Sequence, residues 1–98
     1  MPDLNVVAVL KAKAGSEAVL QDALAGLVAP TRAEDGCIAY ELFRSATDAS
    51  TFITIERWRS QDDLDAHMQT AHIAQALKTA GDAIDGAPAI HPLTPVSE

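Results

Sequence analysis

Three runs of apolar residues along the chain predict β-strands. The run LNVVAVLKAK, residues 4–13, is rich in β-branched residues and apolar on both alternating faces, as in a strand covered on both sides. The runs CIAYELFRS (37–45) and TFITIERW (51–58) alternate instead, and SATDAS between them carries turn residues, so they predict an antiparallel hairpin. In the first of these runs Ile38, Tyr40 and Leu42 share one face, and in the second Phe52, Thr54, Glu56 and Trp58 share one face.

Helical spacing follows the first predicted strand and the hairpin. After Ser16, a suitable N-cap, a stripe of Leu20, Leu24, Leu27 and Val28 predicts a helix that Pro30 should bend or end. Gly36 is suited to a left-handed turn before the next strand.

The segment after the hairpin predicts two further helices. Ser60 and Asp63 resemble a capping box, so a helix should begin at Gln61 and carry Leu64, His67, Met68 and Ala71 on its inner stripe. A second short helix should follow Thr70 and end near Gly81. The run AIHPLTPV then predicts a short last strand, which its prolines restrict to an edge of the sheet.

The order strand, helix, strand, strand, helix, strand predicts an α+β fold of the ferredoxin-like split βαβ type. Its four-stranded antiparallel sheet would have helices on one face only. Because residues 4–13 are apolar on both faces, the other face needs a cover. A second copy of the chain is the simplest cover, so we expect a homodimer.

Composition narrows the choice of partners. Ninety-eight residues suit one domain, spanning 1–98, and hydrophobic residues make up 48% of the chain but aromatic residues only 4%. The formal charge of -7 argues against nucleic acid and anionic membranes as partners. The start of the chain lacks a signal-like pattern, and no apolar run is long enough to span a membrane, so we expect a cytoplasmic protein.

Two of the chain's three histidines, His67 and His72, lie five residues apart. On an unbroken helix this spacing separates their rings by about 140°, so they could converge only if the helix breaks near Thr70. A metal site would also need a distant third ligand, for example Glu56 or His91. We therefore expect no metal, and a surface or interfacial role remains open for each ring.

Glu56 is predicted to share a strand face with Phe52 and Trp58. An acidic group among apolar neighbours needs a partner, and a histidine would serve. The alternative is an ion pair with Arg57 or Arg59 at the margin of the sheet. Trp58 could simply fill the core, although its NH needs a hydrogen-bond acceptor if buried. No glycine-rich phosphate loop, nucleophile elbow or paired cysteine motif is present in the sequence.

Two stretches, TRAEDGCIAYELFRS and FITIERWRSQDDLDAHMQTAHI, resemble the antibiotic biosynthesis monooxygenase (ABM) domain family, and within it the quinol monooxygenase type. The most specific part of the resemblance is the set Glu56, Trp58, His67, Thr70 and His72. The resemblance extends from Leu4 to about Leu93. It implies a ferredoxin-like homodimer, the dimeric α/β barrel, with a pocket between sheet and helices in each protomer.

The resemblance implies a cofactor-independent monooxygenase that oxidises a small hydroquinone or phenolic substrate, with O2 as co-substrate and no metal or flavin. His67 would accept the substrate proton and Glu56 would orient His67. Trp58, Phe52 and Tyr40 would form the walls of the pocket, and Asn5 and His72 would hydrogen-bond substrate oxygens. Two alternatives stay open, namely a cofactor-free isomerase of a small hydroxyketone and a non-catalytic ligand-binding dimeric module.

Overall fold

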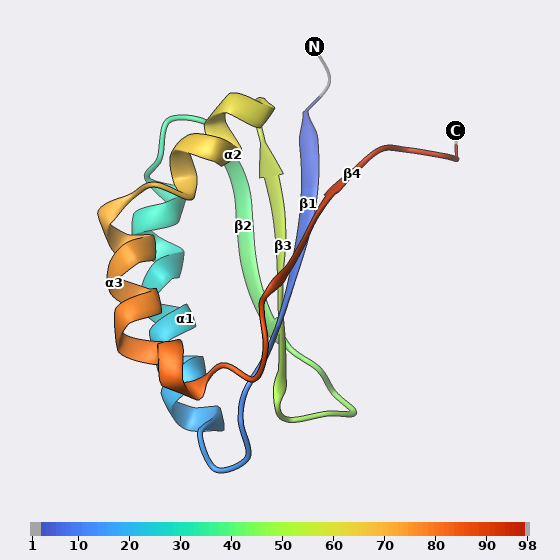
Figure 1. Cartoon of the computed structure of the whole chain (residues 1–98). Helices are drawn as coiled ribbons and strands as arrows, with labels where there is room; N and C mark the ends of the chain where they lie inside the picture. The colour runs from blue at the N-terminus through green and yellow to red at the C-terminus, as the bar shows by residue number, and fades with distance from the viewer. Residues whose placement is uncertain (1–2, 98) are drawn as a thin grey trace.

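A computed structural model describes residues 3–97, and the remaining residues of the predicted domain, 1, 2 and 98, lie outside this part. The strands are β1 (Leu4–Lys11), β2 (Cys37–Arg44), β3 (Thr51–Trp58) and β4 (Ala89–Leu93). The helices are α1 (Glu17–Arg32), α2 (Gln61–His67) and α3 (Ala71–Ala80), and a short 3-10 turn, η1 (Gly81–Ala83), follows α3. Figure 1 shows the helices as one layer and the sheet as the other.

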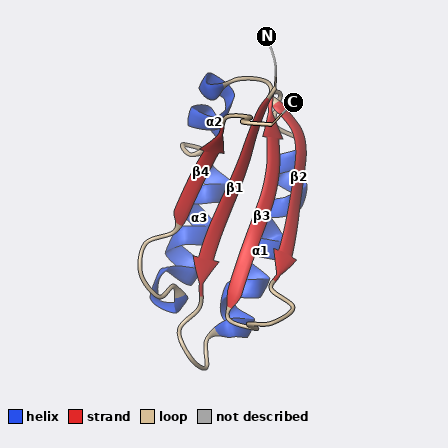
Figure 2. Cartoon of the chain, turned by 90° about the vertical axis from the view of Figure 1, so that its right-hand side faces the viewer, coloured by secondary structure: helices blue, strands red, loops and turns tan. Residues whose placement is uncertain are grey.

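The four strands form one antiparallel sheet in the order β2-β3-β1-β4. This is the ferredoxin-like arrangement, which confirms the predicted fold class. The hairpin of β2 and β3 forms as predicted, and β4 occupies an edge beside β1 (Figure 2). Pro92 is tolerated within β4 because an edge strand needs ladder partners on one side only, and Pro95 lies beyond the end of the strand.

Alternation along the strands divides the sheet into an inner face under the helices and an outer face. Val6, Ala8 and Leu10 of β1 are buried on the inner face, together with the even-numbered residues 52–58 of β3. On the outer face, which no described element covers, Phe43, Ile55 and Leu93 are about half exposed. The expected one-sided helix layer is therefore confirmed.

The structure differs from the predicted elements at the end of α1 and at the start of β2. We predicted that Pro30 would bend or end the helix; it does not end it, because α1 runs on to Arg32. Pro30 lies in the last turn, where its missing N–H removes one hydrogen bond but does not block the two residues that follow. At the start of β2 an irregularity between Cys37 and Ala39 turns Ile38 outwards, so that Cys37, not Ile38, lies on the same side as Tyr40.

The turn between α1 and β2 brings the chain close to α2. Gly36 does not have the left-handed backbone that we predicted. It is needed for space instead, because a β-carbon at this position would overlap the side chain of Asp63. The backbone N–H of Arg59 donates to the Gly36 carbonyl oxygen at 2.9 Å, which ties this turn to the end of β3.

The predicted break between α2 and α3 is present. Ser60 caps α2 by accepting from the Asp63 N–H at 3.3 Å, and Thr70 caps α3 by accepting from the Ile73 N–H at 3.4 Å. His67 is therefore the last residue of one helix, and His72 lies in the first turn of the next. Within residues 3–97 no helix has the length and apolar character needed to cross a membrane, and the cytoplasmic location stays a prediction.

Candidate active site

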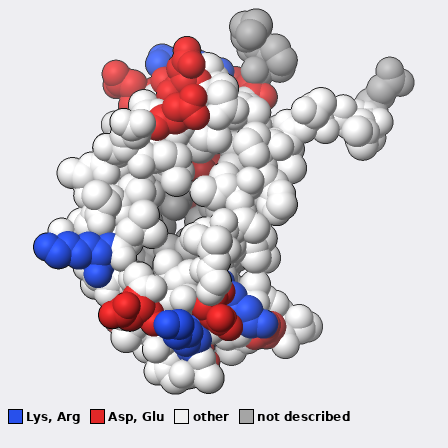
Figure 3. Space-filling view, viewed as in Figure 1, with Lys and Arg blue, Asp and Glu red and all other residues white. Residues whose placement is uncertain are grey.

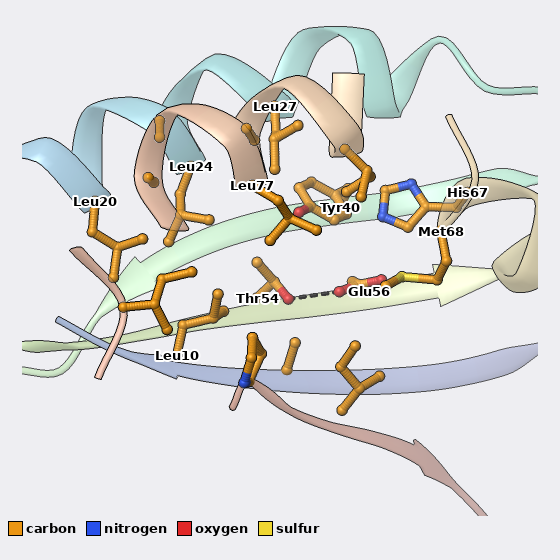
Figure 4. Close-up of a pocket in the computed structure, with 18 residues that line it drawn as sticks. Leu10, Leu20, Leu24, Leu27, Tyr40, Thr54, Glu56, His67, Met68 and Leu77 are labelled. Atoms are coloured by element: carbon orange, nitrogen blue, oxygen red, sulfur yellow. Dashed lines mark hydrogen bonds between the residues drawn. The ribbon is translucent and has the colours of Figure 1, made fainter. Parts of the chain in front are cut away.

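A cavity of about 290 Å³ lies between the inner face of the sheet and helices α1 and α3. Figure 4 shows its polar side chains, those of Tyr40, Thr54, Glu56 and His67, towards one end, whereas Leu10, Leu20 and Leu24 lie at the other. The remaining lining residues are all apolar, namely Ala8, Ala23, Leu27, Met68, Ile73, Ala76, Leu77, Ala80, Ile84, Pro88 and Ile90. The site is thus an apolar chamber with one polar end.

Glu56 is the acidic residue of this polar end. Because side chains two residues apart share a strand face, Thr54 and Trp58 flank its carboxylate on β3. Thr54 Oγ1 donates to Glu56 Oε2 at 2.6 Å, and Trp58 Nε1 donates to Glu56 Oε1 at 2.8 Å. Both carboxylate oxygens of this buried residue are therefore held by neutral donors.

The alternative of an ion pair between Glu56 and a neighbouring arginine is wrong. The Arg57 guanidinium donates to Asn5 Oδ1 at 3.4 Å on the outer face, and the Arg59 guanidinium pairs with Asp63. Glu56 therefore brings an acidic group to the cavity with no basic side chain bonded to it.

His67 is bonded to a glutamate that the sequence analysis did not single out. Its Nδ1 lies 2.7 Å from Glu34 Oε2, and His72 Nε2 lies 2.7 Å from the same oxygen. The two rings converge because the chain breaks between α2 and α3, as the spacing required. Glu34 stands in the turn after α1, so no strand or helix periodicity marked it. The prediction that Glu56 orients His67 is wrong, since Glu34 holds that ring.

The hydrogen bond between His67 and Glu34 determines which ring nitrogen of His67 can accept a proton. A neutral imidazole that donates its Nδ1 hydrogen to a carboxylate keeps Nε2 as a lone-pair acceptor. The ring is 3% exposed and lies near the aromatic rings of Trp58 and Tyr40, with centroid distances of 4.7 Å and 5.8 Å. His67 also lines the cavity. It therefore has the surroundings of a positioned base, with a carboxylate ready to stabilise its protonated form.

Glu34, His67 and His72 are also the residues that could hold a metal ion. One ligand atom from each lies within 4.8 Å of the others. Two imidazoles and a carboxylate suit several divalent transition metals. The third ligand of such a site is Glu34, so the suggested alternatives Glu56 and His91 are wrong; His91 pairs with Val7 on the edge strand and is exposed.

Two further side chains near the polar end have raised pKa values. Burial raises the pKa of the Tyr40 phenol well above its ordinary value, and the carboxylate of Glu56 adds to this effect. Burial, followed by Glu34 and Glu56, likewise raises the pKa of the Cys37 thiol. Both groups stay protonated at neutral pH, so Tyr40 can donate a hydrogen bond to a ligand and Cys37 is a poor nucleophile.

The other predicted site residues do not reach the cavity. Trp58 lies behind His67 and Glu56, and Phe52 belongs to the packed core, so neither is the direct pocket wall that we predicted. His72 contacts Glu34 instead of the cavity. The prediction for Asn5 is wrong, because β1 places it on the outer face. Both faces of β1 are apolar, so the sequence pattern could not decide which one faces the helices.

The chain is similar to known proteins both in sequence and in structure. The model of a family described as antibiotic biosynthesis monooxygenase matches residues 4–79. A Mycobacterium tuberculosis protein named "Putative monooxygenase Rv0793" is 32% identical over 93 residues, which are 95% of this chain and 91% of that protein. Its solved structure has a TM-score of 0.88, with 30% identity and coverage of 99% of this chain and 98% of that one. The crystal structure of PA3566 from Pseudomonas aeruginosa has a TM-score of 0.91 at 30% identity, covering 99% of this chain and 97% of that one.

Proposed function

Because the chain belongs to the antibiotic biosynthesis monooxygenase family, we propose that it is a monooxygenase that oxidises a small hydroquinone or phenol with O2, without metal or flavin. The observation that carries this proposal is the pairing of His67 with Glu34 beside an apolar cavity. A phenol that loses its proton becomes a much better one-electron donor to O2, so a positioned base is what such a reaction needs first.

In the proposed reaction, His67 Nε2 takes the proton of a substrate hydroxyl, and Glu34 stabilises the imidazolium. The substrate anion gives one electron to O2, and the resulting radical and superoxide recombine at a ring carbon to form a peroxide. This carbon then loses its C–H proton while the O–O bond breaks. One oxygen atom stays as a carbonyl, and the other leaves with two protons as water, so that the substrate supplies all four electrons.

The lining of the cavity supports this chemistry in two ways. Apolar side chains on most of the wall exclude water, which protects a radical pair until it recombines. Tyr40, protonated at neutral pH, and Glu56, an acceptor, provide a donor and an acceptor that can hold the oxygens of a phenolic ring. We therefore assign Tyr40 and Glu56 to substrate binding and His67 to proton transfer.

The rival isomerase activity receives less support from the site. A phosphorylated hydroxyketone would need basic side chains for its phosphate group. No lysine or arginine is among the residues that line the cavity. A non-catalytic binding module would have the same cavity, and only turnover separates it from an enzyme.

We also propose that the chain is a homodimer in which two outer sheet faces meet. Half-exposed Phe43, Ile55 and Leu93 all belong to that face, and a large exposed apolar patch on a soluble domain usually marks an interface. Each protomer would keep its own cavity, because the cavity lies on the helix side of the sheet.

Oxygen uptake by the purified protein over a panel of hydroquinones and phenols tests this function. We expect one O2 consumed per substrate, with one atom of ¹⁸O2 in the product by mass spectrometry. An isomerisation assay on hydroxyketones, with and without phosphate, runs in parallel. Isomerisation without oxygen uptake would contradict the proposal in favour of the isomerase, and binding without either reaction would favour the binding module.

A further inference from the structure

We propose that the substrate carries a long aliphatic chain, which the apolar part of the cavity binds while the polar end holds the phenolic ring. This inference rests on the proposed function for the ring, but the part of the site it describes is separate. The site would then select alkyl- or alkenyl-substituted hydroquinones and phenols over the unsubstituted ring.

The cavity is longer along the sheet than one aromatic ring. Glu56 pairs with Val6, whereas Leu10 pairs with Phe52, so the acidic end and the apolar end are four residues apart along the strands. At about 3.3 Å per strand residue this separation is roughly 13 Å, which is well beyond one aromatic ring. A single-ring substrate held by Glu56 and His67 would leave the far part of the cavity unfilled.

The chemistry of the far part is aliphatic. Leu10, Leu20 and Leu24 line the end away from the polar side chains (Figure 4), and Ala80 and Ile84, which pack in the same core cluster, also line the cavity. The aromatic rings among the lining residues, those of Tyr40 and His67, both lie at the polar end. Such a surface offers neither a charge nor a hydrogen bond to a polar substituent, and no aromatic face for a second ring. A flexible hydrocarbon chain is the group that gains from it.

The mouth of the cavity has the same character. Met68, Leu77 and Ile90 line the cavity and are also exposed, at 42%, 48% and 39%. Figure 3 shows a hollow in the middle of this face, surrounded by mostly uncharged surface. Most charged side chains lie towards the two ends of the molecule, and one basic side chain projects from the left-hand edge. An apolar chain can therefore enter without displacing bound ions or breaking an ion pair.

A second copy of the chain is not the expected occupant of this cavity. The outer sheet face, where we place the dimer contact, is on the opposite side of the sheet from the cavity. Helices α1 and α3 cover the cavity above the inner face and leave a partly open volume of about 290 Å³, which suits a small molecule.

Calorimetry with 4-alkylphenols under anaerobic conditions tests the inference without turnover. For the wild type, affinity should rise about three- to four-fold with each added methylene, the gain expected for full burial, until the cavity is full. Two separate variants, Ala23→Leu and Ala76→Leu, place bulk in the cavity from α1 and from α3. Ala74→Leu, an exposed position of α3 outside the cavity, is the matched control.

In both filling variants the rise should stop about three methylenes earlier, because leucine adds three carbons to the space that the chain would occupy. The control should follow the wild type, and circular dichroism checks that each variant folds. An affinity that does not rise with chain length in the wild type, or a rise that neither filling variant shortens, would overturn the inference. Failure of the proposed function is a distinct result: no oxygen uptake with any hydroquinone, whatever the chain-length series gives.

Discussion

Glu34 and His67 form the smallest unit on which the proposed chemistry depends. The glutamate accepts from His67 Nδ1 at 2.7 Å, and it is itself 15% exposed, whereas the histidine is almost fully buried. A carboxylate in this place orients the ring and lowers the free energy of its protonated form. The same oxygen contacts His72, which is partly exposed and links the unit to solvent.

Replacing Glu34 by Gln should therefore lower kcat by roughly 10²-fold or more, with a much smaller change in KM, because the amide cannot stabilise the imidazolium. Steady-state oxygen uptake measures both constants. Glu17→Gln, in the first turn of α1 and away from the cavity, is the matched control. If Glu56→Gln lost the same activity while Glu34→Gln kept it, the orienting role would return to Glu56.

Glu34, His67 and His72 could together hold a metal ion, so the proposed reaction can also be tested for metal dependence. We expect full turnover after dialysis against a strong chelator, because the proposed proton transfer uses His67 as a free base. Elemental analysis of the purified protein and oxygen uptake before and after dialysis provide the measurements. Stoichiometric zinc or iron that survives dialysis, together with loss of turnover when it is removed, would contradict the proton-transfer account.

Residues on regular elements were easier to predict from the sequence than residues in turns. His67, Glu56 and Tyr40 follow helix or strand periodicity, and all three line the cavity. Glu34 has no such signal, because it stands in a turn and its partners are 33 and 38 residues away. Its position depends on Gly36, which lets the turn approach α2 closely, and that closeness is a tertiary effect.

At the scale of elements, the β2–β3 hairpin supplies the strand that carries Glu56. Its turn is organised by Asp48, which accepts from the Ser50 N–H and hydroxyl and from the Thr51 hydroxyl. These hydrogen bonds lower the pKa of Asp48 to about 2. The composition of the sequence identified this turn. It could not predict the irregularity at Ile38, which changes which β2 side chains face the helices.

A lowered pKa means that the charged form of Asp48 stabilises the fold. This contribution is complete above the ordinary aspartate pKa of about 3.9 and is lost as pH falls towards about 2. Asp48→Asn should therefore lower the urea midpoint at pH 7, and its gap to the wild type should narrow between pH 4 and pH 3. An equal gap at pH 7 and pH 3 would show that the charge of Asp48 does not contribute.

For the molecule as a whole, we propose that the outer sheet face forms the dimer contact. Light scattering should give twice the 10.3 kDa chain mass at micromolar concentration. Ile55→Glu, placing a charge on that face, should shift the protein towards the monomer without emptying the cavity, which lies on the other side of the sheet. A wild-type protein that stays monomeric, or an Ile55→Glu variant that dimerises as well as the wild type, would contradict this interface.

The central claim is that His67 takes the substrate proton in an oxygen-dependent reaction. Its most direct test is the rate of oxygen uptake by His67→Ala across the pH range, beside the wild type and Gln69→Ala, an exposed neighbour outside the cavity. At pH 7 the His67 variant should remain folded and lose about 10²- to 10⁴-fold in turnover, as expected for a missing general base. In alkaline solution, where the hydroquinone ionises without help, the loss should shrink. Unchanged turnover of His67→Ala at pH 7 would contradict the account.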